Sequence, residues 1–422
     1  MKKIEVMAPA GSFDSLSAAI RAGADSVYFG VGSLNMRSRA TVNFSIEDLP
    51  KIVKLCKKAG VKTYLTLNII VYDDELKYVR TICDAAKVAG VNAVIAADIA
   101  VMKYANSIGL PVHVSVQANV SNTESVRFYS QFADVMVLAR ELTLPQISNI
   151  IKTIEKDNIC GPSGERIRIE IFTHGALCVS VSGKCYMSLG AYNSSANRGA
   201  CFQNCRRRYR VIDDETGEEL VIDNKYVMSP KDICTLEFLD RLLESGVSIL
   251  KLEGRGRSAD YVDTVTKVYR EACDAWLKNQ FTPENVDLWL EELKTVFNRG
   301  FWKGGYYLGE PLGEWCGFGG SRAKLHKIHL GRVTKYFSKL GVVELNVEAA
   351  ELPQGQLLLI IGPTTGAVKF NASEIRLAGN NVSCAPKGSI VSVPVPRKVR
   401  KNDQLYLLVE RRFGEEVGGD EL

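Results

Sequence analysis

The stretch Val88–Ile95 reads VAGVNAVI and shows the unit from which the fold is built: the end of a helix, a glycine and an apolar strand. The same order recurs at Arg21–Gly30 (RAGADSVYFG), Lys58–Leu65 (KAGVKTYL), Ser107–Val114 (SIGLPVHV) and Glu244–Lys251 (ESGVSILK). Glycine just past a helix adopts the left-handed conformation at little cost. Each of these glycines therefore predicts the end of a helix and the start of a strand.

Eight apolar runs are predicted to be strands, and most are nearly continuous in apolarity, as strands buried on both faces are. They are Ile4–Met7, Ser26–Phe29, Lys62–Leu67, Ala93–Ala96, Val112–Val116, Val135–Ala139, Ile167–Phe172 and Ser248–Leu252. Eight strands alternating with helices over about 280 residues indicate an α/β fold, the (β/α)8 or TIM-like barrel. A doubly wound open sheet is the alternative, although no GxGxxG motif follows the first run to favour a dinucleotide-binding form.

The predicted layout has four parts. Residues 1–282 form the catalytic barrel, with a cysteine-rich insertion (170–210) after the seventh strand, and residues 283–325 form a helical and aromatic connector. Short β-rich runs separated by Gly, Pro and Asn turns predict a small all-β barrel over 326–413, followed by an acidic tail at 414–422. Val211–Tyr226 is expected to be a β-hairpin that turns at Thr216–Gly217.

Composition is that of a soluble globular protein, with 46% hydrophobic and 24% charged residues and a net charge of only +5. No apolar run opens the sequence, so we expect neither a signal peptide nor a membrane span. An odd number of cysteines, eleven, argues against a disulfide framework and for free or metal-bound thiols. These features predict a cytoplasmic protein.

Four cysteines stand out because they fall within 28 residues of a Gly-, Ser- and Asn-rich stretch: Cys178, Cys185, Cys201 and Cys205. Thiolates that converge in this way bind zinc or an iron–sulfur cluster. The spacing lacks the tight CxxC pairs of most zinc sites, which favours the cluster and leaves zinc open. Buried, unrelated thiols are the third interpretation, and the loop-like context disfavours it.

Polar side chains follow the predicted strands at the ends where barrel active sites are built. Any one of them could be an ordinary salt-bridged residue, but as a ring they predict a pocket for an anionic ligand, because guanidinium groups grip carboxylates. Candidate catalytic residues are Gln117, Arg140, Glu141, Glu170 and His174, and candidate substrate-binding residues are Arg37, Arg39, Asn68, Lys251, Glu253 and Arg255. His174 is interpreted as a proton donor, a neighbour of the metal centre or a structural histidine.

Four arginines follow the last of these cysteines, Arg206, Arg207, Arg208 and Arg210, interleaved with Tyr209. Short charged runs are often solvated edges, but beside a candidate active site this one suggests contacts with RNA phosphates. The C-terminal part adds further basic residues, among them Lys324, Lys327, Arg397 and Arg400.

The cysteine stretch resembles the signature of the collagenase-like peptidase family 32 of unknown catalytic type. That signature is Glu-x-Phe-x-x-Gly-small-aliphatic-Cys followed by Gly-x-Cys-x-aliphatic-Ser. It is met at Glu170, Phe172, Gly175, Ala176, Leu177, Cys178, Gly183, Cys185, Met187 and Ser188. The resemblance extends over most of the chain through the segments APAGS, GADSVYFG, SVQANV, LARELTL and LKLEGR.

The resemblance implies one of several activities. Some family members are named collagenases, whereas another branch hydroxylates RNA or ubiquinone precursors without dioxygen, with an iron–sulfur cluster and prephenate. The chain is most similar to the prephenate-dependent tRNA hydroxylases, which convert wobble uridine to 5-hydroxyuridine. The resemblance therefore implies that the four cysteines hold a 4Fe-4S cluster, that prephenate, a small dicarboxylate, is the co-substrate and that tRNA is the partner. A ribosomal RNA cytidine hydroxylase is the nearest alternative.

Two further alternatives come from other classes of protein. A cysteine peptidase would need a thiolate–histidine pair, for which His174 and Cys178 are candidates, but neither GxSxG nor HExxH occurs. A non-catalytic RNA-binding module with a structural zinc is the other. The sequence leaves the oligomeric state open.

Overall fold

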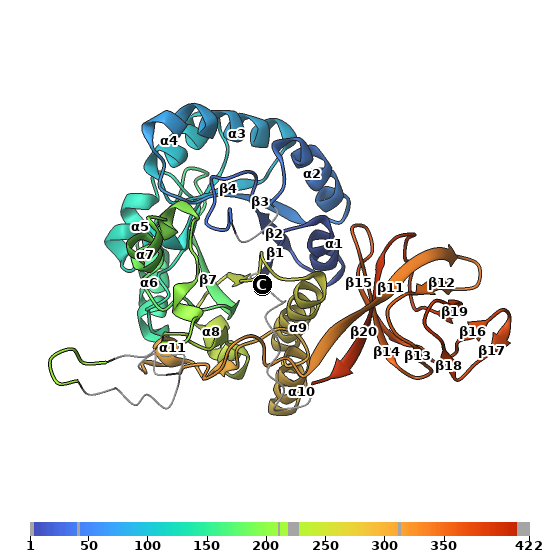
Figure 1. Cartoon of the computed structure of the whole chain (residues 1–422). Helices are drawn as coiled ribbons and strands as arrows, with labels where there is room; N and C mark the ends of the chain where they lie inside the picture. The colour runs from blue at the N-terminus through green and yellow to red at the C-terminus, as the bar shows by residue number, and fades with distance from the viewer. Residues whose placement is uncertain (1–3, 40–42, 210–211, 218–227, 311–313, 412–422) are drawn as a thin grey trace.

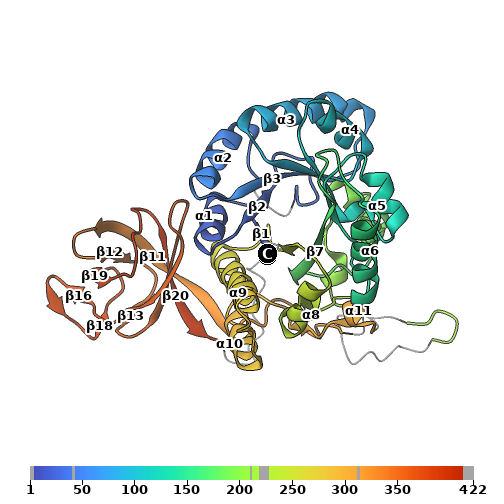
Figure 2. The same ribbon diagram turned by 180° about the vertical axis from the view of Figure 1, so that it is seen from behind.

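The computed structural model describes residues 4–39, 43–209, 212–217, 228–310 and 314–411. A ring of parallel strands forms its larger part (Figure 1, Figure 2). The ring strands are β1 (Glu5–Pro9), β2 (Ser26–Phe29), β3 (Lys62–Leu67), β4 (Ala93–Ala96), β5 (Val112–Val114), β6 (Val135–Val137), β7 (Arg168–Gly175) and β9 (Ile249–Leu252). Each pairs with the next, and β9 pairs with both β7 and β1, which closes the ring. The predicted (β/α)8 barrel is confirmed, and the doubly wound alternative is excluded.

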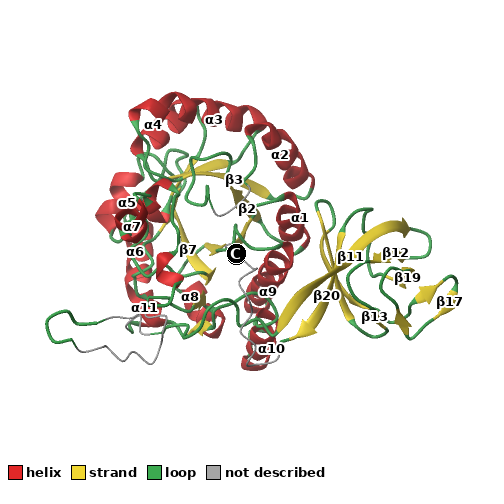
Figure 3. Cartoon of the chain, in the orientation of Figure 1, coloured by secondary structure: helices red, strands yellow, loops and turns green. Residues whose placement is uncertain are grey.

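Helices surround the ring between successive strands (Figure 3). They are α1 (Phe13–Arg21), α2 (Leu49–Lys58), α3 (Leu76–Ala89), α4 (Ile99–Ser107), α5 (Thr123–Tyr129), α6 (Leu144–Lys156), α8 (Leu239–Glu244) and α9 (Ala259–Leu277). The five glycines that predicted helix ends all have positive φ angles, between +68° and +94°. The local sequence therefore sets where these helices stop.

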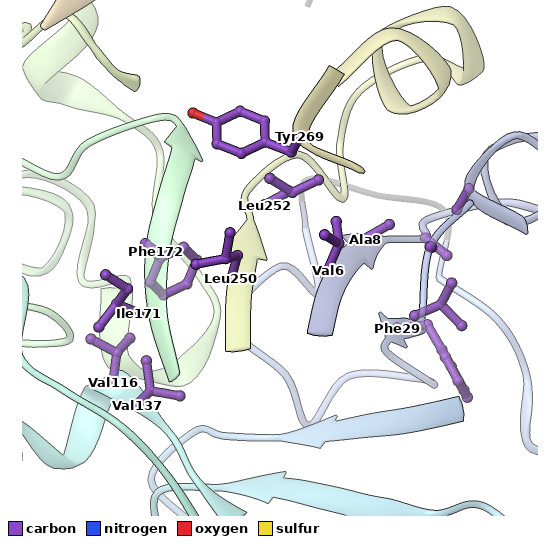
Figure 4. Close-up of a cluster of buried hydrophobic side chains, with 14 of the residues drawn as sticks. Val6, Ala8, Phe29, Val116, Val137, Ile171, Phe172, Leu250, Leu252 and Tyr269 are labelled. Atoms are coloured by element: carbon purple, nitrogen blue, oxygen red, sulfur yellow. The ribbon is translucent and has the colours of Figure 1, made fainter. Parts of the chain in front are cut away.

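The alternation of side chains along each strand separates two cores. Met7, Tyr28 and Ile249 point into the ring, whereas their neighbours, among them Phe29 and Leu250, pack between strands and helices. Figure 4 shows this outer layer, with Val6, Ala8, Phe29, Leu250 and Leu252 around adjacent strands. The side chains that face into the ring at the carboxyl ends of its strands are therefore the ones that can line a site.

Two short strands were not predicted. β8 (Asp232–Cys234) pairs antiparallel with the end of β7, and β10 (Phe301–Trp302) pairs with β8. In the chain, β10 lies between α10 (Pro283–Leu293) and α11 (Gly305–Leu308). Strands of two or three residues are too short to show a periodic pattern. Of the predicted hairpin, Gly217 N donates to Asp213 O in a turn, and both flanking runs extend outside the described residues.

The C-terminal part is an all-β domain, as predicted, built mainly from an eight-stranded antiparallel sheet. Its longer strands are β11 (Leu325–Phe337), β12 (Val342–Val347), β14 (Leu357–Gly362), β15 (Gly366–Asn371), β19 (Ile390–Pro394) and β20 (Gln404–Glu410). The short strands are β13 (Leu352–Pro353), β16 (Arg376–Leu377), β17 (Asn380–Asn381) and β18 (Cys384–Ala385). Leu330, Val343 and Leu405 belong to its separate core. The predicted acidic tail lies outside the described residues.

The β domain is docked on the barrel through α1 and α9 (Figure 1). Ser17 Oγ and Arg21 Nη2 donate to the carbonyls of Pro363 and Thr364 at 2.6 and 2.8 Å. A Cβ on Gly366 would stand 2.8 Å from the backbone nitrogen of Ala18, so the two backbones touch. This contact fixes the β domain beside α1, the helix that follows the first barrel strand. Within the described residues, we find no helix with the length and apolarity to span a bilayer.

Candidate functional site at the barrel mouth

A cavity of about 50 Å³ opens at the carboxyl ends of the barrel strands. Seven of the predicted site residues share it: Arg37, Asn68, Gln117, Arg140, Lys251, Glu253 and Arg255. Its other lining residues are Tyr28, Met36, Thr66, Ser115, Val116 and Phe172. Four cationic side chains and one carboxylate line this mouth pocket, so it favours an anion.

Two of the arginines are held by polar partners. Arg37 donates to Glu253 Oε1 from Nε at 3.2 Å and from Nη2 at 2.7 Å, and this carboxylate raises the pKa of Arg37. Burial alone would raise the pKa of Glu253, but Arg37 lowers it below its ordinary value. Arg255 donates to Asn35 Oδ1 at 3.0 Å and to Thr66 Oγ1 at 2.9 Å, and burial lowers its pKa to about 10.

A buried ionic group forms the floor of the mouth pocket. Lys251 Nζ lies 2.6 Å from Glu170 Oε1, and His113 Nδ1 lies 3.4 Å from Glu170 Oε2. Burial lowers the pKa of Lys251 despite the partner carboxylate, and Lys251 and His113 lower the pKa of Glu170 against the effect of burial. Glu170 therefore holds Lys251 in place rather than lining the pocket itself.

Unlike the other three cations, Arg140 makes no hydrogen bond to a side chain within the described residues. Its guanidinium lies 4.1 Å from the centre of the Phe172 ring, and Nη1 donates to the carbonyl of Ala176 at 3.2 Å. Its Nε is buried and has no hydrogen-bond partner among the described residues. A buried donor without a partner is costly, so this guanidinium is the part of the pocket best prepared for an added acceptor.

Amide side chains form the opposite wall and connect it to the cysteine segment. Asn68 Nδ2 donates to Ser115 Oγ at 3.3 Å and to Gln117 Oε1 at 3.2 Å. Asn119, with a left-handed φ of +54°, donates from Nδ2 to the carbonyls of Gln117 and Ser182 at 2.9 and 3.3 Å. The loop after β5 thus links the pocket to the segment that carries the cysteines.

Besides Glu170, three predicted catalytic or substrate-binding residues lie outside the mouth pocket. Glu141 is exposed, and Arg39 is exposed with its guanidinium 5.2 Å from the centre of the Phe202 ring. His174 is 2% exposed and packs against Tyr261, Tyr269 and Phe301. A register shift between Phe172 and His174 turns His174 out of the ring, where it pairs with Leu252. Burial lowers its pKa to about 4.

The segment after β7 is irregular and is held by side-chain hydrogen bonds. It contains α7 (Met187–Tyr192) and the short 3-10 turns Ala196–Arg198 and Asn204–Arg206. Arg206 donates to the carbonyls of Leu177 and Pro230 and to Ser229 Oγ, at 2.6 to 2.8 Å. Arg198 forms a bidentate pair with Glu75, both bonds 2.6 Å, which ties the segment to the loop after β3.

The four cysteines of this segment are free thiols, with Cys178 exposed and Cys185, Cys201 and Cys205 partly buried. They are electrostatic neighbours: burial, together with charge on the other three cysteines, raises the pKa of Cys205 to about 11. Burial, Cys178 and Cys201 likewise raise the pKa of Cys185. Over the described ranges, however, no three His, Cys, Asp or Glu side chains form a group that could hold one metal ion.

The four predicted RNA-binding arginines do not share one environment. Arg206 is the internal brace described above, Arg207 is exposed and donates to Tyr192 Oη, Arg208 is exposed and Arg210 lies outside the described residues. Three aromatic side chains of the same segment are exposed by 76% (Tyr186), 46% (Tyr192) and 42% (Phe202).

Sequence reasoning missed Tyr28, Thr66, Ser115 and Phe172 as pocket residues. The alternation within the second and third strands places Tyr28 and Thr66 on defined faces and was a usable signal. No local signal marks Asn35, which is buried and accepts from Arg255, a residue 220 positions away.

These observations define a class: a (β/α)8 barrel with a cationic pocket at its mouth and a loop of free thiols beside it. The model of peptidase family U32 matches residues 11–316, more than half of the chain, and the chain belongs to this family.

Its relatives carry two kinds of name. A Porphyromonas gingivalis protein named collagenase is 53% identical over 407 residues, which cover 96% of this chain and 98% of that protein. The tRNA hydroxylation protein P1 of Bacillus subtilis is 34% identical over 308 residues, 71% of this chain and 69% of that protein. The tRNA hydroxylation protein P of Escherichia coli is 27% identical over an alignment of 488 positions, which covers 99% of this chain and 98% of that protein.

Proposed function

We propose that this chain hydroxylates the wobble uridine of tRNA to 5-hydroxyuridine without dioxygen. The observation that carries the proposal is a cationic pocket at the barrel mouth, linked through Asn119 to a loop of four free thiols. Two relatives are named tRNA hydroxylation proteins, and one of them aligns with nearly the whole chain.

The thiols of Cys178, Cys185, Cys201 and Cys205 would hold a 4Fe-4S cluster. The donor set fits because four thiolates are the usual ligands of such a cluster, and all four are free. Each thiolate binds a separate iron, which suits thiols that are neighbours without converging on one ion. When bound, the cluster would supply one-electron redox chemistry. The arginine brace at Arg206 would keep the cysteine segment in place.

The mouth pocket would bind one carboxylate of prephenate, the proposed dicarboxylic co-substrate. The cavity of about 50 Å³ has room for a group of this size, because one water molecule needs roughly 10–15 Å³ on the same measure. The rest of the molecule would extend out of the mouth. Arg140 would donate from its unpartnered Nε, and Lys251 would add a second positive charge below.

RNA would approach the exposed surface of the cysteine segment. Arg207 contacts Tyr192 and Arg39 lies over Phe202, so cations and aromatic rings alternate on this surface. Unpaired bases stack on such rings and their phosphates pair with such cations. A base splayed from the anticodon loop could then reach the mouth.

Two measurements test the proposal. Base-modification profiling of tRNA from a deletion strain is expected to show loss of 5-hydroxyuridine at the wobble position, restored by the intact gene. Unchanged wobble uridines would rule the proposal out, and loss of a ribosomal cytidine modification instead would assign the rRNA reaction.

Iron and sulfide assay after anaerobic purification tests the cluster. We expect both elements in the wild type and in Cys384→Ser, which changes an exposed cysteine of the β domain, and a loss of iron in Cys205→Ser. Zinc in place of iron and sulfide would favour the structural-zinc module.

A collagenase-like peptidase is the second candidate, favoured by the name of the relative at 53% identity. The geometry gives it little support, because His174 is buried among aromatic rings and its Nδ1 makes no hydrogen bond among the described residues. Its lowered pKa also keeps the imidazole neutral at pH 7, where a thiolate–imidazolium pair needs it charged. Collagen cleavage by the wild type that is lost in Cys178→Ala would establish the peptidase.

A further inference from the structure

A second and larger cavity, of about 240 Å³, lies where the barrel meets the β domain. Arg257 and Ser258 line it from the loop before α9, and Lys327, Lys369 and Arg411 line it from the β domain. None of the predicted catalytic, substrate-binding or metal-binding residues borders this interdomain cleft. What the interdomain cleft binds must therefore be inferred from its own lining residues.

Positive charge exceeds negative charge in the interdomain cleft. Asp260 is the one carboxylate among the residues that line it, and Lys327 Nζ pairs with Asp260 at 2.8 Å. That leaves the charges of Arg257, Lys369 and Arg411 uncompensated within the lining. Excess charge of one sign in a cleft with low-dielectric walls attracts an ion of the opposite sign.

The arginines present donors that the protein does not use. Arg257 stacks its guanidinium 3.4 Å from the centre of the Phe297 ring and forms no ion pair with a carboxylate in the part of the chain that the structure describes. Arg411 donates from Nη1 to the carbonyl of Ser321 at 2.7 Å, while its Nε is buried without a partner among those residues. His326 adds a buried ring nitrogen, Nδ1, that also lacks a partner there.

Phosphate is the anion that this arrangement suits best. Guanidinium groups bind its oxygens in bidentate fashion. Ser258 stands at the N-cap position of the 19-residue helix α9 without a side-chain capping bond, and the dipole of this helix favours negative charge. The volume exceeds that of an inorganic ion alone and leaves room for an attached sugar.

One loop serves both the cleft and the mouth pocket. Glu253 and Arg255 point into the mouth pocket, and Arg257 and Ser258, two and three positions after Arg255, line the cleft. Gly254 has a φ of +156°, and a Cβ there would stand 2.5 Å from the Tyr261 ring, so the loop is packed closely on α9. The two sites are therefore held in a fixed relation.

We propose that the interdomain cleft binds a phosphate group of the nucleic acid strand whose base reaches the barrel mouth. The phosphate chemistry follows from the cleft alone, whereas its source in RNA rests on the proposed function. A small phosphate ester would present the same group, and the experiment separates the two sources.

The test measures binding of a fluorescein-labelled RNA hairpin to the full chain by anisotropy over a range of salt concentrations. Arg257→Gln and Lys369→Gln are compared with Lys387→Gln, which removes the same charge from an exposed turn of the β domain away from the cleft. Each cleft variant is expected to make the negative slope of log K against log salt shallower by about 0.7, so that a tenfold rise in salt weakens its RNA binding about fivefold less than that of the wild type. Lys387→Gln should match the wild type.

Wild-type affinity and slope in both cleft variants would overturn the proposal. Lys369 is exposed, so its variant keeps the test valid if Arg257→Gln fails to fold. A second combination of results would replace nucleic acid by a small phosphate ester as the ligand. In that case inorganic phosphate raises the melting temperature of the wild type but not of Lys369→Gln, and both cleft variants bind RNA as the wild type does. If the slopes change as expected but wobble uridines are normal in the deletion strain, the proposed function fails and the cleft proposal stands.

Discussion

Arg140 differs from the other cations of the mouth pocket in having an unused donor. Arg37, Lys251 and Arg255 each contact an oxygen of a neighbouring side chain, whereas among the residues that the structure describes Arg140 contacts a ring and one backbone carbonyl. Removing it should therefore affect ligand binding more than the internal structure of the pocket.

We expect Arg140→Gln to weaken prephenate binding by about ten- to a hundredfold, because hydrogen bonds to charged groups contribute about 1.5–3 kcal/mol. Isothermal titration calorimetry measures the effect. Arg39→Gln is the matched control, since Arg39 is exposed and outside the pocket. Equal affinities of the two variants would contradict the role given to Arg140.

His174 should make stability depend on pH in a defined window. Burial lowers its pKa from 6.5 to about 4, so the unfolded chain binds the proton more readily than the folded one. The contribution of neutral His174 to the free energy of unfolding is fully present above pH 6.5 and is lost as the pH falls to about 4, a change of about 3 kcal/mol. Over this range the melting temperature of the wild type should therefore fall more on acidification than that of His174→Leu. His329→Leu, at an exposed site, should keep the wild-type pH dependence.

At the scale of elements, the run of arginines after Cys205 divides into two functions. Arg206 holds three oxygens of the surrounding chain, and Arg207 lies exposed against Tyr192. The sequence predicted one RNA-binding surface because adjacent arginines look alike until their partners, 15 to 29 residues away, are known.

Arg206→Gln should destabilise the protein by about 2–4 kcal/mol, because it leaves buried carbonyls without a donor. Iron content should fall with it, since the brace spans the cysteine segment. Arg207→Gln should change stability by less than about 0.5 kcal/mol and weaken RNA binding instead. Thermal melting, iron assay and RNA anisotropy on both variants test these expectations. Equal loss of iron from Arg206→Gln and Arg207→Gln would contradict the separate functions given to the two arginines.

Secondary structure followed from the sequence wherever a local pattern determined it. Ser26–Phe29, Lys62–Leu67 and Ala93–Ala96 are strands with the predicted bounds. The fifth strand ends earlier than predicted because Val116 begins a 3-10 turn. The turn of His174 out of the ring could not be predicted, since a bulge depends on register with a strand about 80 residues away.

At the scale of the molecule, closure of the ring decides what the strand ends can do together. Arg37 and Glu253 are 216 residues apart and meet only because β9 pairs with β1. The sequence indicated which residues lie at the strand ends. Closure of the ring brings seven of them together around the mouth pocket, whereas Glu141 lies at the surface. No sequence signal joined the two walls of the interdomain cleft, because Arg257 in the barrel and Lys369 in the β domain are far apart in the sequence.

Docking of the two domains should depend on the lack of a side chain at Gly366. A Cβ there would press on the backbone of Ala18, which cannot yield as a flexible side chain can. Gly366→Ala should therefore separate β15 from α1, lower the melting temperature and, by widening the interdomain cleft, weaken its phosphate contact.

Gly388→Ala is the matched control, because Gly388 also has a positive φ, +84°, but has open space around its Cβ position. Both variants bear the cost of a left-handed alanine, about 1 kcal/mol, and only Gly366→Ala adds the clash. Small-angle scattering should show a larger radius of gyration for Gly366→Ala alone, and its salt slope for RNA binding should fall as in Lys369→Gln. If Gly366→Ala left the radius of gyration unchanged but still changed the salt slope of RNA binding, the slope would not depend on how closely the two domains dock.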